Sequence, residues 1–245
     1  MTTFATISLE ELVGEAALLT RLDRKYLLPA AELPELLGRM PSGVRMLEIG
    51  GQRSFAYRSV YFDTAGLDSY HAAAHGRRRR FKVRIRSYLD TGLDFVEVKT
   101  RGARGTTVKE RIRYEGDGSR LGPEGVEYAQ SVLADAGIPA DGLDFHPVMA
   151  TYYRRTTLYV PATGSRVTVD SDLAWQLPDG SSTRMPDSVV VETKSARAAS
   201  DVDRLLWSLG HRPCRISKYA TGLAALRPDL PANKWHGVLR RHFTS

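Results

Sequence analysis

Three consecutive segments between residues 81 and 114 alternate apolar and charged side chains with a period of two. Neighbouring side chains on a strand point to opposite faces, so the alternation predicts three strands. Gly92 and the run "RGARG" mark short connections, which favour antiparallel neighbours. One face must be covered by other apolar elements, because it carries Phe81, Val83, Ile85, Val96, Val98, Val108, Ile112 and Tyr114.

The other face of these segments carries eight cations and one carboxylate: Lys82, Arg84, Arg86, Glu97, Lys99, Arg101, Lys109, Arg111 and Arg113. Alternation alone would also arise in a sheet with one solvated face and no function. The sign of the charges argues against that reading. The chain has 35 Lys and Arg against 28 Asp and Glu, and like charges on adjacent strands repel. If the sheet closes into a barrel, this face lines a cationic tunnel suited to successive phosphates.

The rest of the chain mixes strand and helix patterns. Strands are expected over 20–29, 54–64, 148–160, 165–177 and 188–195. Helices are expected over 8–19, 30–40, 65–76, 201–210 and 217–226, and a loop–helix–loop insertion over 115–146. This order predicts an α+β fold in which an eight-stranded antiparallel β-barrel has helices packed outside it, as a single domain over 1–245. Asp63 is interpreted as a cap ahead of a helix rather than as a catalyst.

The strands outside the opening stretch also collect polar groups on one side. The sets that share a face are Arg21, Asp23 and Lys25; Tyr153 and Arg155; Arg166, Thr168, Asp170 and Asp172; and Glu192 and Lys194. A few carboxylates are thus scattered among many cations. Mg²⁺ or Mn²⁺ takes one or two carboxylates together with phosphate oxygens and water. This mixture of side chains is typical of a metal–triphosphate site.

Composition narrows the partners and the compartment. A net charge of +7 and a pI of about 9.6 favour anionic partners. The single cysteine, Cys214, excludes an intrachain disulfide and favours a cytoplasmic location. Neither a signal-peptide pattern nor a membrane-spanning run is present, although peripheral association with a separate membrane protein stays open. The basic run "HGRRRRFK" over 75–82 lacks any nucleic-acid fold signature, so no nucleic-acid partner is expected.

The motifs "LDRKY", "SVYFDT", "VRIRSY", "FVEVKT", "VKER", "YYRRT", "RVTVDSDL", "VVETK" and "SKY" follow one another in this order. Together they resemble the VTC domain, the catalytic domain of vacuolar transporter chaperone polyphosphate polymerases. That domain is one of the triphosphate tunnel metalloenzymes, which include CYTH-type adenylyl cyclases and thiamine triphosphatases. The resemblance covers a core of about 20–235. It implies an eight-stranded tunnel that binds a nucleotide triphosphate with Mn²⁺ or Mg²⁺.

The resemblance also implies an activity and roles for individual residues. The activity is transfer of the γ-phosphoryl group of ATP to a growing polyphosphate chain. Residues matching the catalytic positions are Lys25, Arg84, Arg86, Lys99, Arg155 and Lys218. Substrate binding is expected of Lys82, Lys109, Arg111 and Lys194, and metal binding of Glu192, Asp170 and Glu97.

Two departures from the wider superfamily bear on the activity. The first strand carries Arg21, Asp23 and Lys25 where CYTH enzymes carry ExExK, which weakens a hydrolase or cyclase reading. The chain also lacks the SPX domain and membrane segments of the eukaryotic members, so it resembles a stand-alone bacterial form. Two alternatives remain: a metal-dependent triphosphatase using the same tunnel, and a sensor that binds polyphosphate or nucleotide without turnover.

Overall fold

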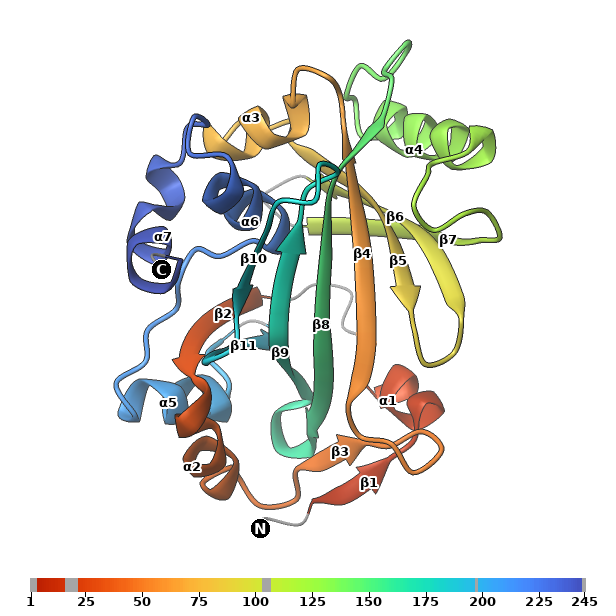
Figure 1. Cartoon of the computed structure of the whole chain (residues 1–245). Coiled ribbons are helices and arrows are strands. Elements are labelled where there is room, and N and C mark those ends of the chain that lie inside the picture. The colour runs from red at the N-terminus through yellow and green to blue at the C-terminus, as the bar shows by residue number, and fades with distance from the viewer. Residues whose placement is uncertain (1–3, 16–21, 103–106, 197, 244–245) are drawn as a thin grey trace. The chain divides into compact units, whose positions relative to one another are not determined.

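The computed structural model describes residues 4–15, 22–102, 107–196 and 198–243 (Figure 1). Its strands are β1 (Ala5–Ile7), β2 (Leu22–Pro29), β3 (Arg45–Leu47), β4 (Phe55–Asp63), β5 (Phe81–Tyr88), β6 (Leu93–Arg101), β7 (Thr107–Tyr114), β8 (His146–Val160), β9 (Ser165–Gln176), β10 (Ser182–Met185) and β11 (Ser188–Ser195). Its α-helices are α1 (Leu9–Glu15), α2 (Leu33–Gly38), α3 (Asp68–Ala74), α4 (Pro123–Asp135), α5 (Asp201–Ser208), α6 (Lys218–Leu226) and α7 (His236–His242). Short 3₁₀ helices span Ala30–Glu32, Pro161–Thr163 and Asn233–Trp235.

The eight long strands follow the hydrogen-bonded order β2-β11-β9-β8-β4-β5-β6-β7. The ladders of β11 with β2 and β9, and of β5 with β4 and β6, are antiparallel, as is that of β6 with β7. The expected α+β fold around eight antiparallel strands is therefore confirmed. Strands β2 and β7 are the two ends of this order, so the hydrogen-bonded path is not closed within the described residues.

Most expected elements are present, with ends displaced by a few residues. The helix expected over 8–19 is observed over Leu9–Glu15, and its last part lies outside the described residues. Strands β1, β3 and β10 and helix α7 were not expected. A strand of three or four residues is too short to display alternation, which is the signal that identified the long strands.

The residues group into two compact units, each built from separate stretches of chain. The first unit comprises 1–55, 153–173 and 185–215, and the second comprises 56–152, 174–184 and 216–245. The expectation of a single domain over 1–245 stays a prediction.

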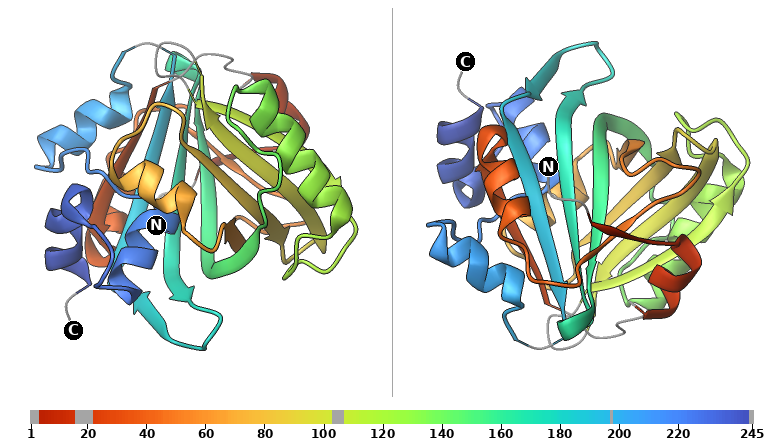
Figure 2. Two further views of the ribbon diagram at one scale, coloured as in Figure 1. Left: turned by 90° about the horizontal axis from the view of Figure 1, so that it is seen from above. Right: turned by 90° about the horizontal axis from the view of Figure 1, so that it is seen from below.

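In the second unit, the apolar face of β5 and β6 is covered by α4 (Figure 2). Val83, Ile85, Val96 and Val98 are almost completely buried there, as the alternation predicts. Val108 is an exception, because its side chain lies on the same face but is 41% exposed. The reason is its place on β7, which lies at an end of the strand order.

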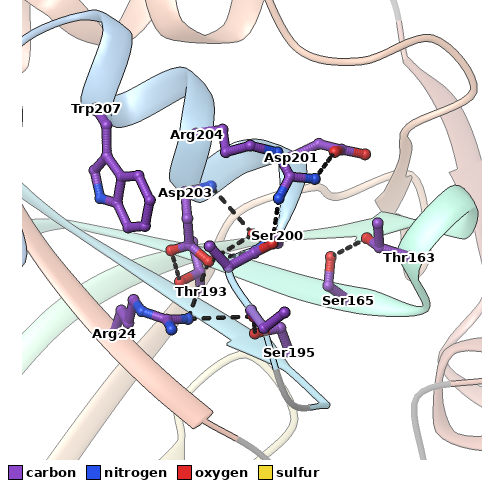
Figure 3. A network of polar contacts seen from close by, with 12 residues as sticks. Arg24, Thr163, Ser165, Thr193, Ser195, Ser200, Asp201, Asp203, Arg204 and Trp207 are labelled. Carbon is purple, nitrogen blue, oxygen red and sulfur yellow. Dashed lines mark hydrogen bonds and ion pairs between the residues drawn. The ribbon is translucent and has the colours of Figure 1, made fainter.

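In the first unit, one buried carboxylate attaches α5 to the sheet (Figure 3). Asp203 accepts hydrogen bonds from Tyr26 Oη (2.7 Å), Thr193 Oγ1 (2.6 Å) and the backbone amide of Ser200 (2.7 Å). Arg24 adds an ion pair at 3.3 Å. Burial alone raises the pKa of Asp203, but these hydrogen bonds outweigh it and lower the pKa below its usual range. The helix is thereby held against β2 and β11.

Candidate functional site

The charged face of β5, β6 and β7 is arranged as the alternation predicts. Across the three strands, Lys82 lies opposite Lys99, which lies opposite Lys109. In the next row, Arg84 lies opposite Glu97, and Glu97 opposite Arg111. Directly opposite residues share a face of the sheet. The second unit therefore has one cationic face, defined here by Lys82, Arg84, Arg86, Glu97, Lys99, Lys109 and Arg111 and called the β5–β7 face.

Glu97 is the buried counter-charge of the β5–β7 face. Its carboxylate accepts hydrogen bonds from Arg84 Nε (2.9 Å) and from Arg84 Nη2, and from Lys109 Nζ (3.1 Å). Arg86 Nη1 lies 3.9 Å away. Burial raises the pKa of Glu97, but the charges of Arg84, Arg86 and Lys109 prevail and hold it well below its usual range. One carboxylate thus fixes the positions of three cations.

Arg84 is also held from β4 by aromatic residues that sequence reasoning did not select. Its Nη1 donates to Tyr61 Oη at 3.1 Å, and the Tyr61 ring stacks on Tyr219 with centroids 5.1 Å apart. The Tyr219 hydroxyl in turn donates to Asp63. Tyr61 and Asp63 lie within the quoted motif "SVYFDT" and Tyr219 within "SKY". The two motifs were therefore the sequence signal for these residues, although the sequence analysis assigned no site role to either tyrosine.

Asp63 lies at the end of β4 and caps the following turn, as the sequence predicts. Its carboxylate accepts the backbone amides of Thr64, Ser69 and Tyr70, each at 2.9 Å. Burial raises the pKa of Asp63, although these hydrogen bonds oppose the rise. The additional bond from Tyr219 ties the first turn of α6 to the end of β4.

Arg86 lies beside Tyr57 and has a buried Nε. Its guanidinium carbon lies 5.6 Å from the centre of the Tyr57 ring. Its Nε is buried and has no hydrogen-bond partner in the described part of the chain. An unsatisfied buried donor is costly and rare, which marks this position as suited to an acceptor supplied by a ligand.

The start of α6 brings Lys82 close to the "SKY" segment. Lys82 Nζ donates to Ser217 Oγ at 2.8 Å, and the same hydroxyl accepts the amide of Ala220 as the helix cap. The backbone oxygen of Lys218 accepts a hydrogen bond from Trp175 Nε1 at 2.7 Å. Lys218 is therefore placed at the first turn of a fixed helix, one residue after the contact with Lys82.

Exposure increases across the β5–β7 face from strand to strand. The side chain of Arg84 on β5 is 8% exposed, and that of Lys109 on β7 is 31% exposed. Arg113, farther along β7, is 66% exposed. Arg111 packs over the Phe95 ring at 4.7 Å and donates to Tyr88 Oη at 3.4 Å. The cations on β7 are thus more exposed to solvent than Arg84 on β5.

The first unit has a second charged face, made by β2, β9 and β11. Glu192 lies opposite Lys25 on β2 and Thr168 on β9. Lys194 lies opposite Asp23 and Arg166 in the same way. We call the set Asp23, Lys25, Arg155, Arg166, Thr168, Asp170, Glu192 and Lys194 the β11 face. Asp172, expected beside Asp170, has a positive φ of 54° and is exposed, so the alternation is interrupted there.

Ion pairs organise the β11 face. Arg155 holds both oxygens of Asp170, with Nε at 2.6 Å and Nη2 at 2.8 Å. Lys194 Nζ lies 3.8 Å from Glu192. Burial lowers the pKa of Lys194 to about 8, opposed by Glu192 and reinforced by the charge of Arg155. Lys194 therefore changes its charge close to neutral pH, which ordinary lysines do not.

Within each unit, the structure brings the expected site residues together. The β5–β7 face and the start of α6 contain Lys82, Arg84, Arg86, Glu97, Lys99, Lys109, Arg111 and Lys218. The β11 face contains Lys25, Asp170, Glu192 and Lys194, with Arg155 bound to Asp170. The catalytic, substrate-binding and metal-binding roles of these residues, and their enclosure in one tunnel, stay predictions.

The carboxylates differ in how they are engaged. Glu97 and Asp170 each accept two N–H groups from one arginine. Glu192 lies farther from its neighbouring cation, 3.8 Å from Lys194 Nζ, and its side chain is 13% exposed. No group of three or more His, Cys, Asp or Glu side chains that could hold a metal occurs among the described residues. A metal held largely by substrate oxygens and a single carboxylate fits this donor set, with Glu192 as that carboxylate.

None of the helices in the described ranges is both long and apolar enough to cross a bilayer. The chain is similar to three solved structures at low identity. One is a candidate adenylyl cyclase from Hippeastrum, described as having a dominant triphosphatase activity (18% identity, TM-score 0.48, covering 88% of this chain and 100% of that one). The second is a candidate adenylate cyclase from Vibrio parahaemolyticus (13%, 0.40, 85% and 87%). The third is a conserved hypothetical protein from Pyrococcus furiosus (14%, 0.43, 78% and 91%).

No curated protein matches the sequence. The sequence profile of the VTC domain, however, matches residues 20–227. This range contains every motif on which the resemblance was based and most of the chain. The chain therefore belongs to the VTC domain family.

Proposed function

We propose that the protein is an ATP-dependent polyphosphate polymerase that transfers the γ-phosphoryl group of ATP to the end of a polyphosphate chain. Membership of the VTC domain family supports a phosphate-handling enzyme. The observation that carries the proposal is the β5–β7 face, where a row of cations shares one buried carboxylate and Arg86 Nε has no protein acceptor in the described chain. Such a face has positive charge in excess, and phosphate oxygens supply the missing acceptors.

The reaction needs positioning and charge neutralisation more than covalent chemistry by the protein. The bond from the γ-phosphorus to the β–γ bridging oxygen breaks, and a terminal oxygen of the polymer forms the new bond. ADP leaves with the electron pair of the broken bond. The attacking oxygen is already anionic, so no general base is required. In this scheme Arg84, Arg86, Lys25 and Arg155 hold the triphosphate.

The remaining cations receive supporting roles. We assign Lys99 and Lys218 to neutralising charge at the reacting phosphates. Lys82, Lys109, Arg111 and Lys194 would bind the rest of the substrate or the polymer. The fixed positions of Arg84 and Lys109 around Glu97 support these roles, because charges held in place stabilise a transition state without reorganisation.

Glu192 is the residue that we assign to hold Mn²⁺ or Mg²⁺. When bound, the metal would neutralise charge on phosphate oxygens. Glu97 and Asp170, which the sequence also suggested as ligands, are engaged by arginine. In the present proposal they contribute by orienting Arg84 and Arg155.

The test is incubation of purified protein with ATP and Mn²⁺, followed by measurement of long polyphosphate on a gel and of free phosphate. Long polymer supports the proposal. Free phosphate alone indicates a triphosphatase, and neither product indicates a sensor. Arg84→Ala and Glu192→Gln should each abolish polymer formation in a folded protein.

Matched controls are available at α2, where Glu35 in the helix and Arg39 at its C-cap form an exposed i,i+4 ion pair. Arg39→Ala and Glu35→Gln remove the same charges from exposed positions outside both charged faces and should leave polymer formation unchanged. Full activity in Arg84→Ala or Glu192→Gln would contradict the assignment.

A further inference from the structure

We propose that the second unit contains a separate binding pocket for a phosphate monoester that carries a compact apolar or aromatic body. The pocket has a volume of about 350 Å³. It is lined by β4, the loop before α4, the first half of β8 and the turn after β9. The proposal does not rest on the polymerase activity, because none of the cations assigned to that reaction lines this pocket.

The pocket lies on the opposite side of the sheet from the β5–β7 face. On β4, Tyr61 points toward Arg84, and side chains alternate along the strand. Val60 therefore points the other way, where it joins the apolar cluster covered by α4. Arg58, two residues earlier, shares the face of Val60, and both line the pocket. A ligand here would not compete for the cations of the β5–β7 face.

Arg58 supplies the first polar group. Its Nε is buried and has no hydrogen-bond partner among residues that the structure describes. A buried N–H without an acceptor is unfavourable, and a bound oxyanion would relieve that penalty. The guanidinium fork also suits two oxygens of one phosphate. Arg58 therefore brings to the pocket a buried donor that is satisfied by no acceptor among the described residues.

Arg120 supplies a second guanidinium from a loop that is fixed in place. The Tyr114 hydroxyl donates to the backbone oxygen of Arg120 at 2.9 Å and accepts the amide of Gly122 at 2.8 Å. A Cβ at Gly116 would lie 2.5 Å from Tyr114 Oη, so the close approach of this loop requires glycine. The wall that carries Arg120 is therefore formed before any ligand binds.

The two arginines act on a common region. Hydrogen bonds from Ser119 lower the pKa of exposed Asp117, and the charges of Arg120 and Arg58 lower it further. Both guanidinium groups therefore lie within electrostatic reach of one carboxylate. Because Asp117 is exposed, solvent screens its repulsion of a dianionic phosphate bound by the arginines.

The remaining lining defines the rest of the ligand. Pro147, Pro178 and the ring of Tyr152, none of which is buried, contribute apolar surface. A bare polyphosphate chain has nothing to place against such surface, whereas an aromatic ring would be desolvated there. The combination of two arginines with this surface selects a compact body that carries one phosphate, such as an aryl phosphate or a nucleoside monophosphate.

Isothermal titration of the full chain with phenyl phosphate, AMP and inorganic phosphate tests the proposal. Phenyl phosphate or AMP should bind at least about tenfold more tightly than inorganic phosphate, because burial of an apolar ring adds to the charge term. A difference between phenyl phosphate and AMP identifies which body the pocket prefers. No saturable binding of either ester would overturn the proposal.

Variants locate the binding. Arg58→Gln and Arg120→Gln should each weaken binding of the better ester by about tenfold or more, the effect expected for a lost charged hydrogen bond. Arg84→Ala and the control Arg39→Gln should leave it unchanged. Unchanged affinity in Arg120→Gln, whose exposed side chain can be replaced without harm to folding, would refute the site, as would loss of binding in Arg84→Ala. Polymer synthesis is measured separately, so failure of either proposal is distinguishable from failure of the other.

Discussion

The hydroxyl of Tyr219 donates a hydrogen bond to the carboxylate of Asp63, which lies 156 positions earlier in the chain. This bond joins the first turn of α6 to the end of β4. The same tyrosine ring stacks on Tyr61, whose hydroxyl accepts a hydrogen bond from Arg84. A continuous set of contacts therefore leads from a capping carboxylate to an arginine of the β5–β7 face, and each member can be tested.

Tyr219→Phe retains the stacked ring but removes the donor to Asp63. We expect the free energy of unfolding to fall by about 1–3 kcal/mol, because a buried carboxylate loses a partner. The measurement is chemical denaturation at neutral pH. Tyr128→Phe on α4 is the matched control, since Tyr128 is only partly buried. An equal effect of the two substitutions would contradict a special role for the Asp63 contact.

Glu97→Gln removes the negative charge shared by Arg84, Arg86 and Lys109. We expect a loss of about 3 kcal/mol in metal-free buffer, because buried cations lose their counter-charge. A metal ligand without that structural role would instead alter stability only when metal is present. Glu110→Gln, at an exposed position on β7, is the control and should change little.

The pKa of Glu97 also predicts a pH dependence. Since the folded protein holds this pKa well below 4.5, the carboxylate contributes stability above that pH. The contribution is lost as the pH falls below 4.5, because the unfolded chain then binds the proton more readily. Between pH 5 and 3, the free energy of unfolding measured by denaturation should therefore fall more steeply for the wild type than for Glu97→Gln. Parallel pH profiles would argue against an ionised Glu97.

Lys194 should give opposite pH trends in activity and stability. Its pKa of about 8 in the folded chain means that the ammonium is lost above that pH. The Michaelis constant for ATP should then rise by up to about tenfold between pH 7 and 9, as the charged fraction falls. Stability should increase from pH 8 toward 10.5, because the unfolded chain binds more protons there. Lys194→Arg stays charged and should flatten the kinetic profile; an unchanged profile would refute the assignment.

Asp203→Asn should lower the stability of the protein without changing its affinity for substrate. It weakens a buried set of hydrogen bonds from Tyr26, Thr193 and Ser200, so unfolding should become easier by about 2–3 kcal/mol. The residue takes no part in the proposed reaction, and the Michaelis constant for ATP should stay constant at a temperature where the variant is folded. Asp201→Asn, in the same helix, provides the comparison. A changed Michaelis constant with unchanged stability would be the contrary result.

Much of this arrangement could be predicted from local pattern. Alternation assigned both faces of β5 and β6 correctly, because a period of two is a direct consequence of strand geometry. For Val108 it predicted the correct face but not the burial, because burial depends on which elements cover that face. Alternation also failed at Asp172, where a left-handed backbone conformation changes the direction of the side chain.

Pairwise relationships could not be predicted in the same way. That Glu97 lies directly opposite Arg84 depends on the register of two strands, which the sequence of either strand does not specify. Asp63 is at the end of β4, whereas its partner Tyr219 lies in α6. The pocket at Arg58 and Arg120 combines four separate stretches of chain. Sequence therefore indicated which chemistry was present, and the fold determined which groups meet.

The increase in exposure from Arg84 through Lys109 to Arg113 has a consequence for how a long polyanion could leave. A phosphate moving across the face from β5 to the exposed end of β7 would regain its hydration shell in small increments while the protein's charges recede. No single step would require the phosphate to lose all of its contacts with lysine and arginine at once. If the proposed polymerase activity is correct, such a shallow free-energy slope would suit a product that slides by one unit after each addition.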